Sequence, residues 1–503
     1  MKRFLERHRD RITGTLSGFD RMLFRGTLRS IAHVSGLQIF LYSQHVLMKE
    51  FGSYALQLSE RLIEHAKELA RKAGRPYVYL PSSKDSKEEL ALQIVARDAL
   101  KQGLIVVFAC VEPCKSFDLR KDRATKHLKL VSKERKCLHL YFYYLDREFG
   151  LMHVRLQSWL PFTIQVCVNG REWLARQMDR AGISYQQRDN CFSHIADPQR
   201  AQQLMDRLTN RNFNPFLDAL ARKVNPWIDP HTGLDVRSYY WSGRQMEYAT
   251  DVMFRNSASL AELYPLLLRH AMFQFGSEEV MRFLQRRTDK RFTGEVSSDL
   301  QRRVEGIRVK HRVEENSIKM YDKQGSVLRI ETTINNPRRF RVHRQGWSGA
   351  KRKMKWLPLR KGVADLRRRA ELSRGANARY LDALAVVGLQ TPSYQLLDRV
   401  SERVKAKRQY RALRPVSPED ASLFQVIMHG EFSLQGFRNR DLRQALGQSV
   451  SAARISRLLA LLRAHKLIFK VCKTNYYRIT SKGHQVMATA LKFRQPDCAL
   501  LAA

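Results

Sequence analysis

The segment SVSAARISRLLALLRAHKLI, residues 449–468, has the hydrophobic pattern of an amphipathic helix. Its apolar side chains recur at the three- and four-residue spacing that places them on one helical face, and they are Ile455, Leu458, Leu459, Leu461 and Leu462. Arg454, Arg457 and Arg463 fall outside this apolar set. We therefore expect a helix that is buried on one side and presents arginines on the other.

The flanking sequence predicts a small domain around this helix. SPEDASLFQVIMHGEF (417–432) is typical of a helix that begins at Ser417, and GFRNRDLRQAL (436–446) of a short second helix. FKVCKTNYYRIT (469–480) is typical of two strands joined by a turn, and SKGHQVMATALKF (481–493) of a closing helix. We expect residues 416–493 to form one domain of three helices, two strands and a last helix.

NRDLRQAL, SAARISRLLALLRAHKLI and YYRITSKG in this segment resemble the winged-helix DNA-binding domains of the MarR type. The resemblance implies that Ser451, Arg454 and Arg457 enter the major groove of DNA. Arg463 is a further arginine available on the outside of the helix and a candidate for nucleic-acid binding. It also implies that Lys470 and Lys473 place a wing on phosphates or in the minor groove. A winged helix that contacts protein or RNA is the alternative.

The charge of the whole chain points to a polyanionic partner. The 503 residues include 90 Lys+Arg and 48 Asp+Glu, a formal net charge of +42. Neutralising phosphates releases counterions, so such a chain is expected to bind nucleic acid, with DNA favoured, RNA possible and an anionic membrane as the rival. The apolar runs are shorter than the ~20 residues of a membrane span, so we expect no membrane partner.

The expected compartment is the cytoplasm, in association with the nucleoid. MKRFLERHRDRITG at the start has no apolar stretch of the secretory kind. Seven cysteines, an odd number, favour a reducing interior over a disulfide framework. The sequence leaves the oligomeric state open, and a dimer fits a DNA-binding protein.

Positive charge is densest between residues 336 and 374, which contain 14 Lys+Arg and 2 Asp+Glu. Its centre is the cluster Lys351, Arg352, Lys353, Lys355 and Trp356. A solvated surface normally mixes charges of both signs, so this run predicts an extended or helical arm on a phosphate backbone. A targeting signal would have the same composition.

The predicted fold class is α+β, with several domains. We expect a helical N-terminal region (1–75), a mixed α/β body (76–210), a second helical region (211–300) and a β-hairpin segment (301–345). A basic helical arm or linker (346–415) and the winged helix (416–493) complete the chain.

The hairpin segment contains NSIKMYDKQGSVLRIETTIN (316–335), two alternating strands around a turn at Gly325. Its polar face carries Lys319, Arg329 and Glu331, and we expect the two cations near phosphate. IKMYDK followed by LRIE resembles a strand pair of the replication initiators of rolling-circle plasmids and filamentous phages. That resemblance implies Glu331 as a metal ligand, although no His-hydrophobic-His motif accompanies it. A solvated sheet face with Lys319 and Glu331 paired is the alternative.

Carboxylates at strand ends are candidates for a Mg²⁺-dependent nicking or strand-transfer site, because paired metals stabilise the attacking and leaving oxygens. They are Asp146 (with Glu148 nearby), Asp189 and Glu331, and ordinary turn chemistry is the alternative for Asp146 and Glu148. Cys110, Cys114, Cys137 and His139 have an uncommon spacing, so zinc is not expected. There is no GxxxxGK[ST] phosphate loop.

These patterns favour a DNA-binding protein of a mobile element, of the transposase, recombinase or replication-initiator kind. The winged helix would find a site, the arm would hold phosphates, and the body would act on the strand. A transcriptional regulator without catalysis and an RNA-binding partner of a structured non-coding RNA are the alternatives.

Overall fold

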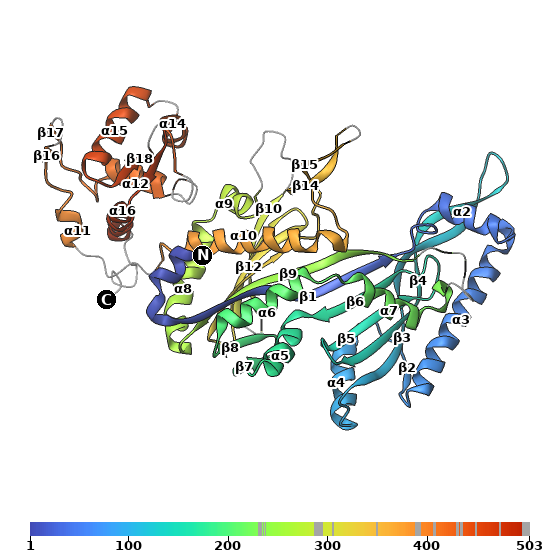
Figure 1. Ribbon diagram of the computed structural model, residues 1–503. Coiled ribbons are helices and arrows are strands. Elements are labelled where there is room, and N and C mark those ends of the chain that lie inside the picture. Colours follow the sequence, from blue (N-terminus) through green and yellow to red (C-terminus); the bar gives the residue numbers. More distant parts are fainter. Residues whose placement is uncertain are drawn as a thin grey trace. The chain divides into compact units, whose positions relative to one another are not determined.

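The computed structural model describes most of the chain (Figure 1). The described residues are 1–229, 234, 236, 238–285, 295–303, 306–348, 351–387, 394–405, 409–428, 432, 436–447, 450–471 and 474–494. They contain many helices and one large mixed sheet, so the predicted α+β class is confirmed.

Two compact units divide the chain. The body unit comprises Gly14–Asp251 and Glu331–Arg374, and the terminal unit comprises Met1–Thr13, Val252–Ile330 and Gly375–Ala503. The elements that begin in the body unit or just before it are β1 (Ile12–Thr27), α2 (Val34–Ser43), α3 (Phe51–Lys72), β2 (Tyr77–Leu80), α4 (Lys87–Arg97), β3 (Gly103–Lys121), β4 (Leu128–Asp146), β5 (Gly150–Gln157), β6 (Ile164–Asn169), α5 (Gly170–Arg180), β7 (Tyr185–Arg188), β8 (Cys191–Ile195), α6 (Pro198–Asn210), α7 (Asn214–Val224), β9 (Tyr240–Phe254), β14 (Arg341–Ser348), β15 (Lys351–Pro358) and α10 (Leu366–Leu384).

The terminal unit holds the remaining elements. They are α1 (Lys2–Arg7), α8 (Ser257–Phe273), α9 (Ser277–Phe283), β10 (Val296–Arg303), β11 (Gly306–Val313), β12 (Asn316–Lys323), β13 (Val327–Thr333), α11 (Tyr394–Asp398), β16 (Val404–Lys405), β17 (Gln409–Tyr410), α12 (Pro418–Met428), α14 (Asn439–Leu446), α15 (Ala452–Ala464), β18 (Ile468–Lys470), β19 (Tyr477–Ile479) and α16 (Ser481–Arg494).

The large sheet has 11 strands in the order β10-β11-β12-β13-β9-β1-β6-β5-β4-β3-β2. β2 and β3 are parallel, and α4 provides the crossover that a parallel pair requires. The pairs β1–β6, β6–β5, β5–β4 and β4–β3 are antiparallel. The sheet is therefore mixed.

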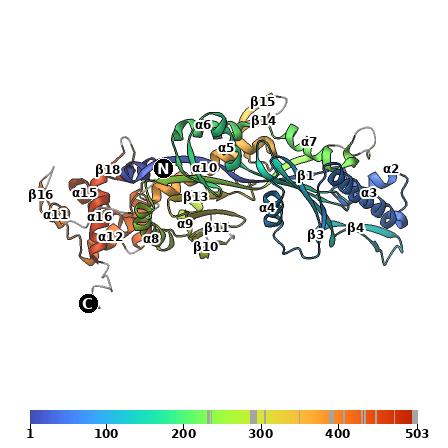
Figure 2. The ribbon, with the colours of Figure 1, turned by 90° about the horizontal axis from the view of Figure 1, so that it is seen from below.

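The two faces of the sheet in the body unit are covered by different helices. α5, α6 and α7 lie on one side and α4 lies on the other (Figure 2). Phe24 of β1 packs on Phe213, at the start of α7, with ring centroids 4.9 Å apart. Because side chains alternate along a strand, the next residue, Arg25, is directed to the opposite face. This alternation positions the cationic pocket described below.

Two long strands replace expected helices. Residues 12–27 of the supposedly helical N-terminal region form β1, and residues 240–254 of the second helical region form β9. Seven consecutive residues of β9, from Tyr248 to Phe254, are buried. Strands buried on both faces lose the alternation that identifies a strand in sequence, so the pattern resembled neither type of element clearly. The N-terminal region does contain a long helix, α3, at residues 51–72.

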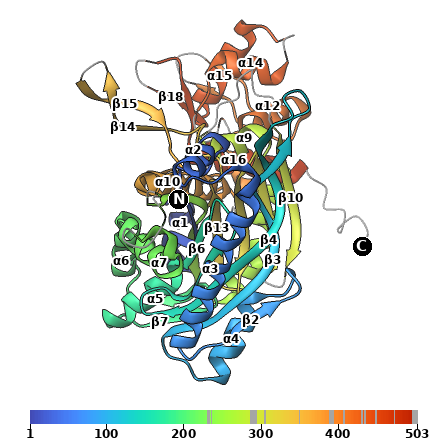
Figure 3. The ribbon, with the colours of Figure 1, turned by 90° about the vertical axis from the view of Figure 1, so that its right-hand side faces the viewer.

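The cluster from Lys351 to Trp356 lies in a β-hairpin, which is the extended form of the expected arm, while the later part of the basic stretch is helical in α10. β14 and β15 form a two-stranded sheet of their own, in which His343 lies opposite Trp356 and Trp347 opposite Arg352. Figures 1 and 3 show this ribbon apart from the large sheet. The sequence KRKMKWLP explains the strand: its lysines alternate with Arg352, Met354 and Trp356 at the period of two that places them on opposite faces. A helix would mix these two sets around its surface.

Candidate nucleic-acid interface

Helix α15 presents a cationic face beside a buried one. Ile455, Leu459 and Leu462 are 0–2% exposed within the core formed with α12, α14 and α16. Arg454, Arg457 and Arg463 are exposed, as the helical spacing predicts. The apolar period of the sequence thus fixes which arginines face solvent.

Polar contacts hold the first turn of α15 against α14. The side-chain amide of Asn439 donates to the carbonyl of Ala452 at 3.0 Å and to the hydroxyl of Ser456 at 2.9 Å. The hydroxyl of Ser451 caps α15 by accepting from the backbone N–H of Arg454 at 3.3 Å. Ser451 was expected to contact bases; in the structure its oxygen is used for capping, and its O–H remains able to donate.

The strand pair that follows carries further cations. Lys470, opposite Tyr477, is exposed, and Arg478 on the neighbouring strand is exposed too. Lys473 lies outside the described residues. Arg438, before α14, stacks over the ring of Tyr476 with 4.8 Å from its guanidinium carbon to the centroid. Arg438 and Arg478 were not expected from the sequence, although Arg478 lies within YYRITSKG and Arg438 directly precedes NRDLRQAL, two of the segments that carry the resemblance.

The β14–β15 ribbon has two chemically different faces. The strand register places Lys351, Lys353 and Lys355 on one face. The other face carries Trp347 and Trp356, 67% and 63% exposed, together with Arg352 and Met354. Arg352 stacks on Trp347 at 5.1 Å, and His343 lies 5.5 Å from Trp356. Such a ribbon offers cations to phosphates on one side and aromatic planes to bases on the other.

The two hairpin cations that were predicted near phosphate, Lys319 and Arg329, are not on an open face. β12 and β13 form as expected and Gly325 has a φ of +75° in their turn. However, every residue of β13 is buried, with Arg329 0% and Glu331 3% exposed. The expectation of an open polar face fails for these two because β13 is an interior strand of the sheet, between β12 and β9. Lys319 is half-buried.

The candidate carboxylates have separate roles. Asp146 accepts from the backbone N–H groups of Glu148 and Phe149 at 2.8 and 2.9 Å, which is turn chemistry. Asp189 is exposed in the β7–β8 turn with a φ of +50°, and Glu331 is buried within β13. Within the described ranges, no group of three or more His, Cys, Asp or Glu could hold a metal ion. The structure thus does not bring Asp146, Asp189 and Glu331 together.

The cysteines considered for zinc line β3 and β4. Cys110 faces His139 across the strands, and the sulfurs of Cys114 and Cys137 are 2.8 Å apart. Hydrogen bonding from Cys137 lowers the pKa of Cys114. His139 is buried, and burial lowers its pKa to about 4. The cysteine pair and the histidine do not form a group able to hold a metal in the part of the chain that is described.

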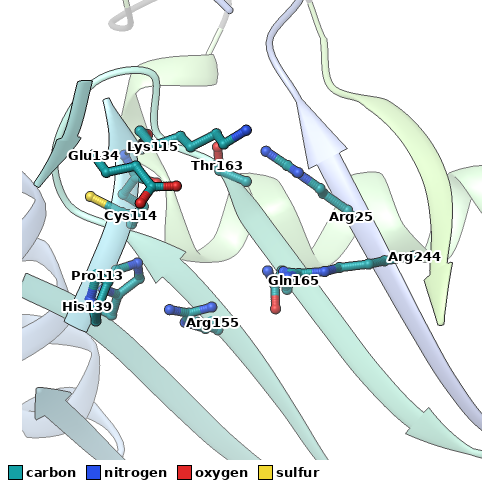
Figure 4. A pocket seen from close by; sticks show the side chains of 11 residues that line it. Arg25, Pro113, Cys114, Lys115, Glu134, His139, Arg155, Thr163, Gln165 and Arg244 are labelled. Carbon is teal, nitrogen blue, oxygen red and sulfur yellow. Dashed lines mark hydrogen bonds between the residues drawn. The ribbon is translucent and has the colours of Figure 1, made fainter. Parts of the chain in front are cut away.

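A cationic pocket on the body sheet was not predicted from the sequence. Its cations come from strands far apart in the chain: Arg25 from β1, Lys115 from β3, Arg155 from β5 and Arg244 from β9 (Figure 4). Arg244 is exposed on β9. No sequence signal joins these four residues, because sheet topology alone brings them together.

Comparison with protein-family models, with curated proteins and with solved structures found no match to this chain. Among the helices that the structure describes, none has both the length and the apolar composition that a membrane crossing requires.

Proposed function

We propose that this chain is a DNA-binding protein whose residues 416–493 form a winged-helix reader of the MarR type. The observation that carries the proposal is the exposed, arginine-bearing face of α15, fixed at its first turn by Asn439 of α14. In a helix-turn-helix the second helix lies in the major groove and its N-terminal residues contact base edges. Arg454 and Arg457 occupy that part of α15, and guanidinium groups pair with guanine through two hydrogen bonds.

The remaining cations supply the affinity that does not depend on sequence. We assign phosphate contacts to the exposed Lys470 and Arg478 of the strand pair and to the lysine face of the β14–β15 ribbon. The net charge of +42 supports a polyanionic partner of this kind.

Site-directed binding without strand cleavage is the form of this function that the carboxylates support best. Metal-dependent strand cleavage needs two or more carboxylates around one reacting phosphate, and Asp146, Asp189 and Glu331 are used in two turns and one buried strand. A transcriptional regulator, or a mobile-element protein that acts by marking its DNA site, fits this arrangement.

Competition between nucleic acids tests the proposal. Fluorescence anisotropy would follow the displacement of a labelled mixture of duplex DNA by unlabelled duplex DNA and by a folded RNA hairpin of equal charge. DNA should compete at least tenfold better across a salt titration. If the RNA hairpin competes better at every salt concentration, the DNA proposal is wrong and the RNA-binding alternative takes its place.

A further inference from the structure

One row of side chains across the body sheet forms the floor of the cationic pocket. Arg25 of β1 is directly opposite Gln165 of β6, and Gln165 is directly opposite Arg155 of β5. Residues in register share a face, so the two arginines flank the amide of Gln165 on the side of the sheet that carries α4. Neighbouring strands are about 4.8 Å apart, so β1 and β5 hold the two arginine backbones about 10 Å apart.

Two more cations, Lys115 and Arg244, line the sides of the cavity. Lys115 and Arg244 converge with Arg25 on the same space (Figure 4). The cavity has a volume of about 260 Å³, which suits a phosphate with a sugar-sized group rather than a large cofactor. The other lining residues are Pro113, Cys114, Glu134, His139, Gln157 and Thr163.

The cations of the pocket exceed its carboxylates. Arg155 forms an ion pair with Glu112 at 2.7 Å, but that carboxylate also binds Lys87 at 3.2 Å and accepts from the hydroxyl of Tyr141. Glu134 is the one carboxylate among the lining residues, against four cations. Burial, together with the nearby charges of Arg244 and Arg155, lowers the pKa of Arg25. The pocket therefore carries uncompensated positive charge.

Two buried donors in the pocket have no acceptor. The Nε atoms of Arg25 and Arg155 are enclosed and donate to no group among the residues described. A buried donor without an acceptor costs about 1–3 kcal/mol. Gln157, in contrast, is fully used: its amide donates to the carbonyls of Lys115, Trp159 and Leu160. The Gln157 amide therefore has no N–H left for a ligand, whereas the Nε donors of Arg25 and Arg155 remain unused.

We propose that this pocket binds a phosphate group, held by Arg25, Arg155, Arg244 and Lys115. Planar guanidinium groups match the tetrahedral oxygens of phosphate with paired hydrogen bonds, and the Gln165 amide supplies a further donor between them. The phosphate can belong to a free nucleotide or to a nucleic-acid backbone. This site lies in the body unit, and its assignment does not depend on DNA binding by residues 416–493.

Thermal unfolding of the full chain tests the assignment at constant ionic strength. Inorganic phosphate, adenosine 5′-monophosphate and a ten-nucleotide oligothymidylate would be titrated into wild type, Arg25→Gln, Arg244→Gln and the control Arg61→Gln, an exposed arginine of α3. Phosphate should raise the melting temperature of wild type and Arg61→Gln. Each pocket variant should weaken the apparent Kd for phosphate at least tenfold.

The variants also separate binding from folding. Without phosphate, Arg25→Gln should melt at the wild-type temperature or above it, because one of several repelling cations is removed. If Arg25→Gln loses only the rise in melting temperature caused by adenosine monophosphate, the ligand is a free phosphorylated molecule. If it loses the rise caused by the oligonucleotide as well, a backbone phosphate is a further ligand. Equal phosphate shifts in wild type and both pocket variants would overturn the proposal.

Discussion

Arg457 is the single side chain on which the proposed base readout depends most. It is exposed on α15, its Nε donates only weakly to the carbonyl of Ala453 at 3.4 Å, and it forms no ion pair with a carboxylate among the described residues. Replacing it with alanine should weaken binding to a preferred duplex by about 1–3 kcal/mol. Arg457→Lys, the matched control, should keep the salt dependence and lose the base preference, since lysine cannot form the paired contact. Anisotropy titrations of preferred and scrambled duplexes measure both effects; equal loss on the two duplexes would contradict base readout.

Arg171 and Asp251 form an ion pair that is entirely buried in the body unit. Their side chains are 0% and 1% exposed, the Nη2–Oδ2 distance is 3.0 Å, and Arg171 also donates to the carbonyl of Ala249. Asp251→Asn should lower the free energy of unfolding by about 3–5 kcal/mol, because it leaves a buried guanidinium without its counter-charge. Urea denaturation measures the loss. Glu64→Gln, which removes an exposed pair with Arg61, should change stability by less than about 1 kcal/mol.

The exposure of single residues could be predicted on a helix but not in the sheet. Arg454, Arg457 and Arg463 were placed correctly on the exposed side of their helix because the helical period is a local property. Arg329 and Glu331 were expected on an open face and are buried, because a strand's exposure depends on its neighbours in the sheet and not on its own sequence. The sequence could not predict that Arg25 and Arg155 line the same pocket, because only the order of the strands in the sheet brings them close together.

At the scale of elements, the β14–β15 ribbon makes a separable contribution. The slope of log K against log salt is negative for a protein that binds phosphates. If the lysine face contacts phosphates, changing Lys351, Lys353 and Lys355 together to glutamine should make this slope less steep by up to about 3 units. The control changes Lys67, Lys72 and Lys101, three lysines elsewhere, in the same way and should leave the slope unchanged. A slope equal to that of wild type in the ribbon variant would remove the ribbon from the interface.

The start of α12 is held by a buried carboxylate. Asp420, 2% exposed, accepts two hydrogen bonds from Arg411 at 2.6 and 2.9 Å and one from the backbone N–H of Arg414 at 2.7 Å. Asp420→Ala should therefore destabilise residues 416–493 by about 1–3 kcal/mol, because the backbone N–H of Arg414 loses its acceptor while the half-exposed Arg411 can be hydrated. Hydrogen exchange should show faster exchange in α12 and α16, which pack together, while β3 and β4 are unchanged. Unchanged protection of α12 would contradict this role for Asp420.

Short elements with a clear period were predictable, and long buried strands were not. The expected order of three helices, two strands and a last helix in residues 416–493 is the order in the structure, since each element there is amphipathic over its own length. β9 and the middle of β1 were missed because burial on both faces removes the alternation there. The basic arm was assigned by its charge, which does not distinguish a helix from a hairpin.

The whole molecule should lose stability in mild acid. Burial lowers the pKa of His139, His270 and His311 to about 4 each, below the value near 6.5 of an unfolded chain. Between pH 6.5 and 4 the unfolded state therefore binds more protons, so the free energy of unfolding falls as the pH is lowered through that window. Calorimetry should show a lower melting temperature at pH 5.5 than at pH 7.5. A constant or rising melting temperature would show that these histidines accept protons in the folded state.

The central claim is that α15 reads duplex DNA, and selection from a random duplex library tests it most directly. Wild type, the Arg454→Ala/Arg457→Ala variant and the Arg61→Ala control would each be taken through the same rounds at one fixed salt concentration. We expect one enriched motif with wild type and the control, and salt-sensitive binding without any motif for the double variant. Enrichment of the same motif by the double variant, or of no motif by wild type, would show that α15 does not read bases.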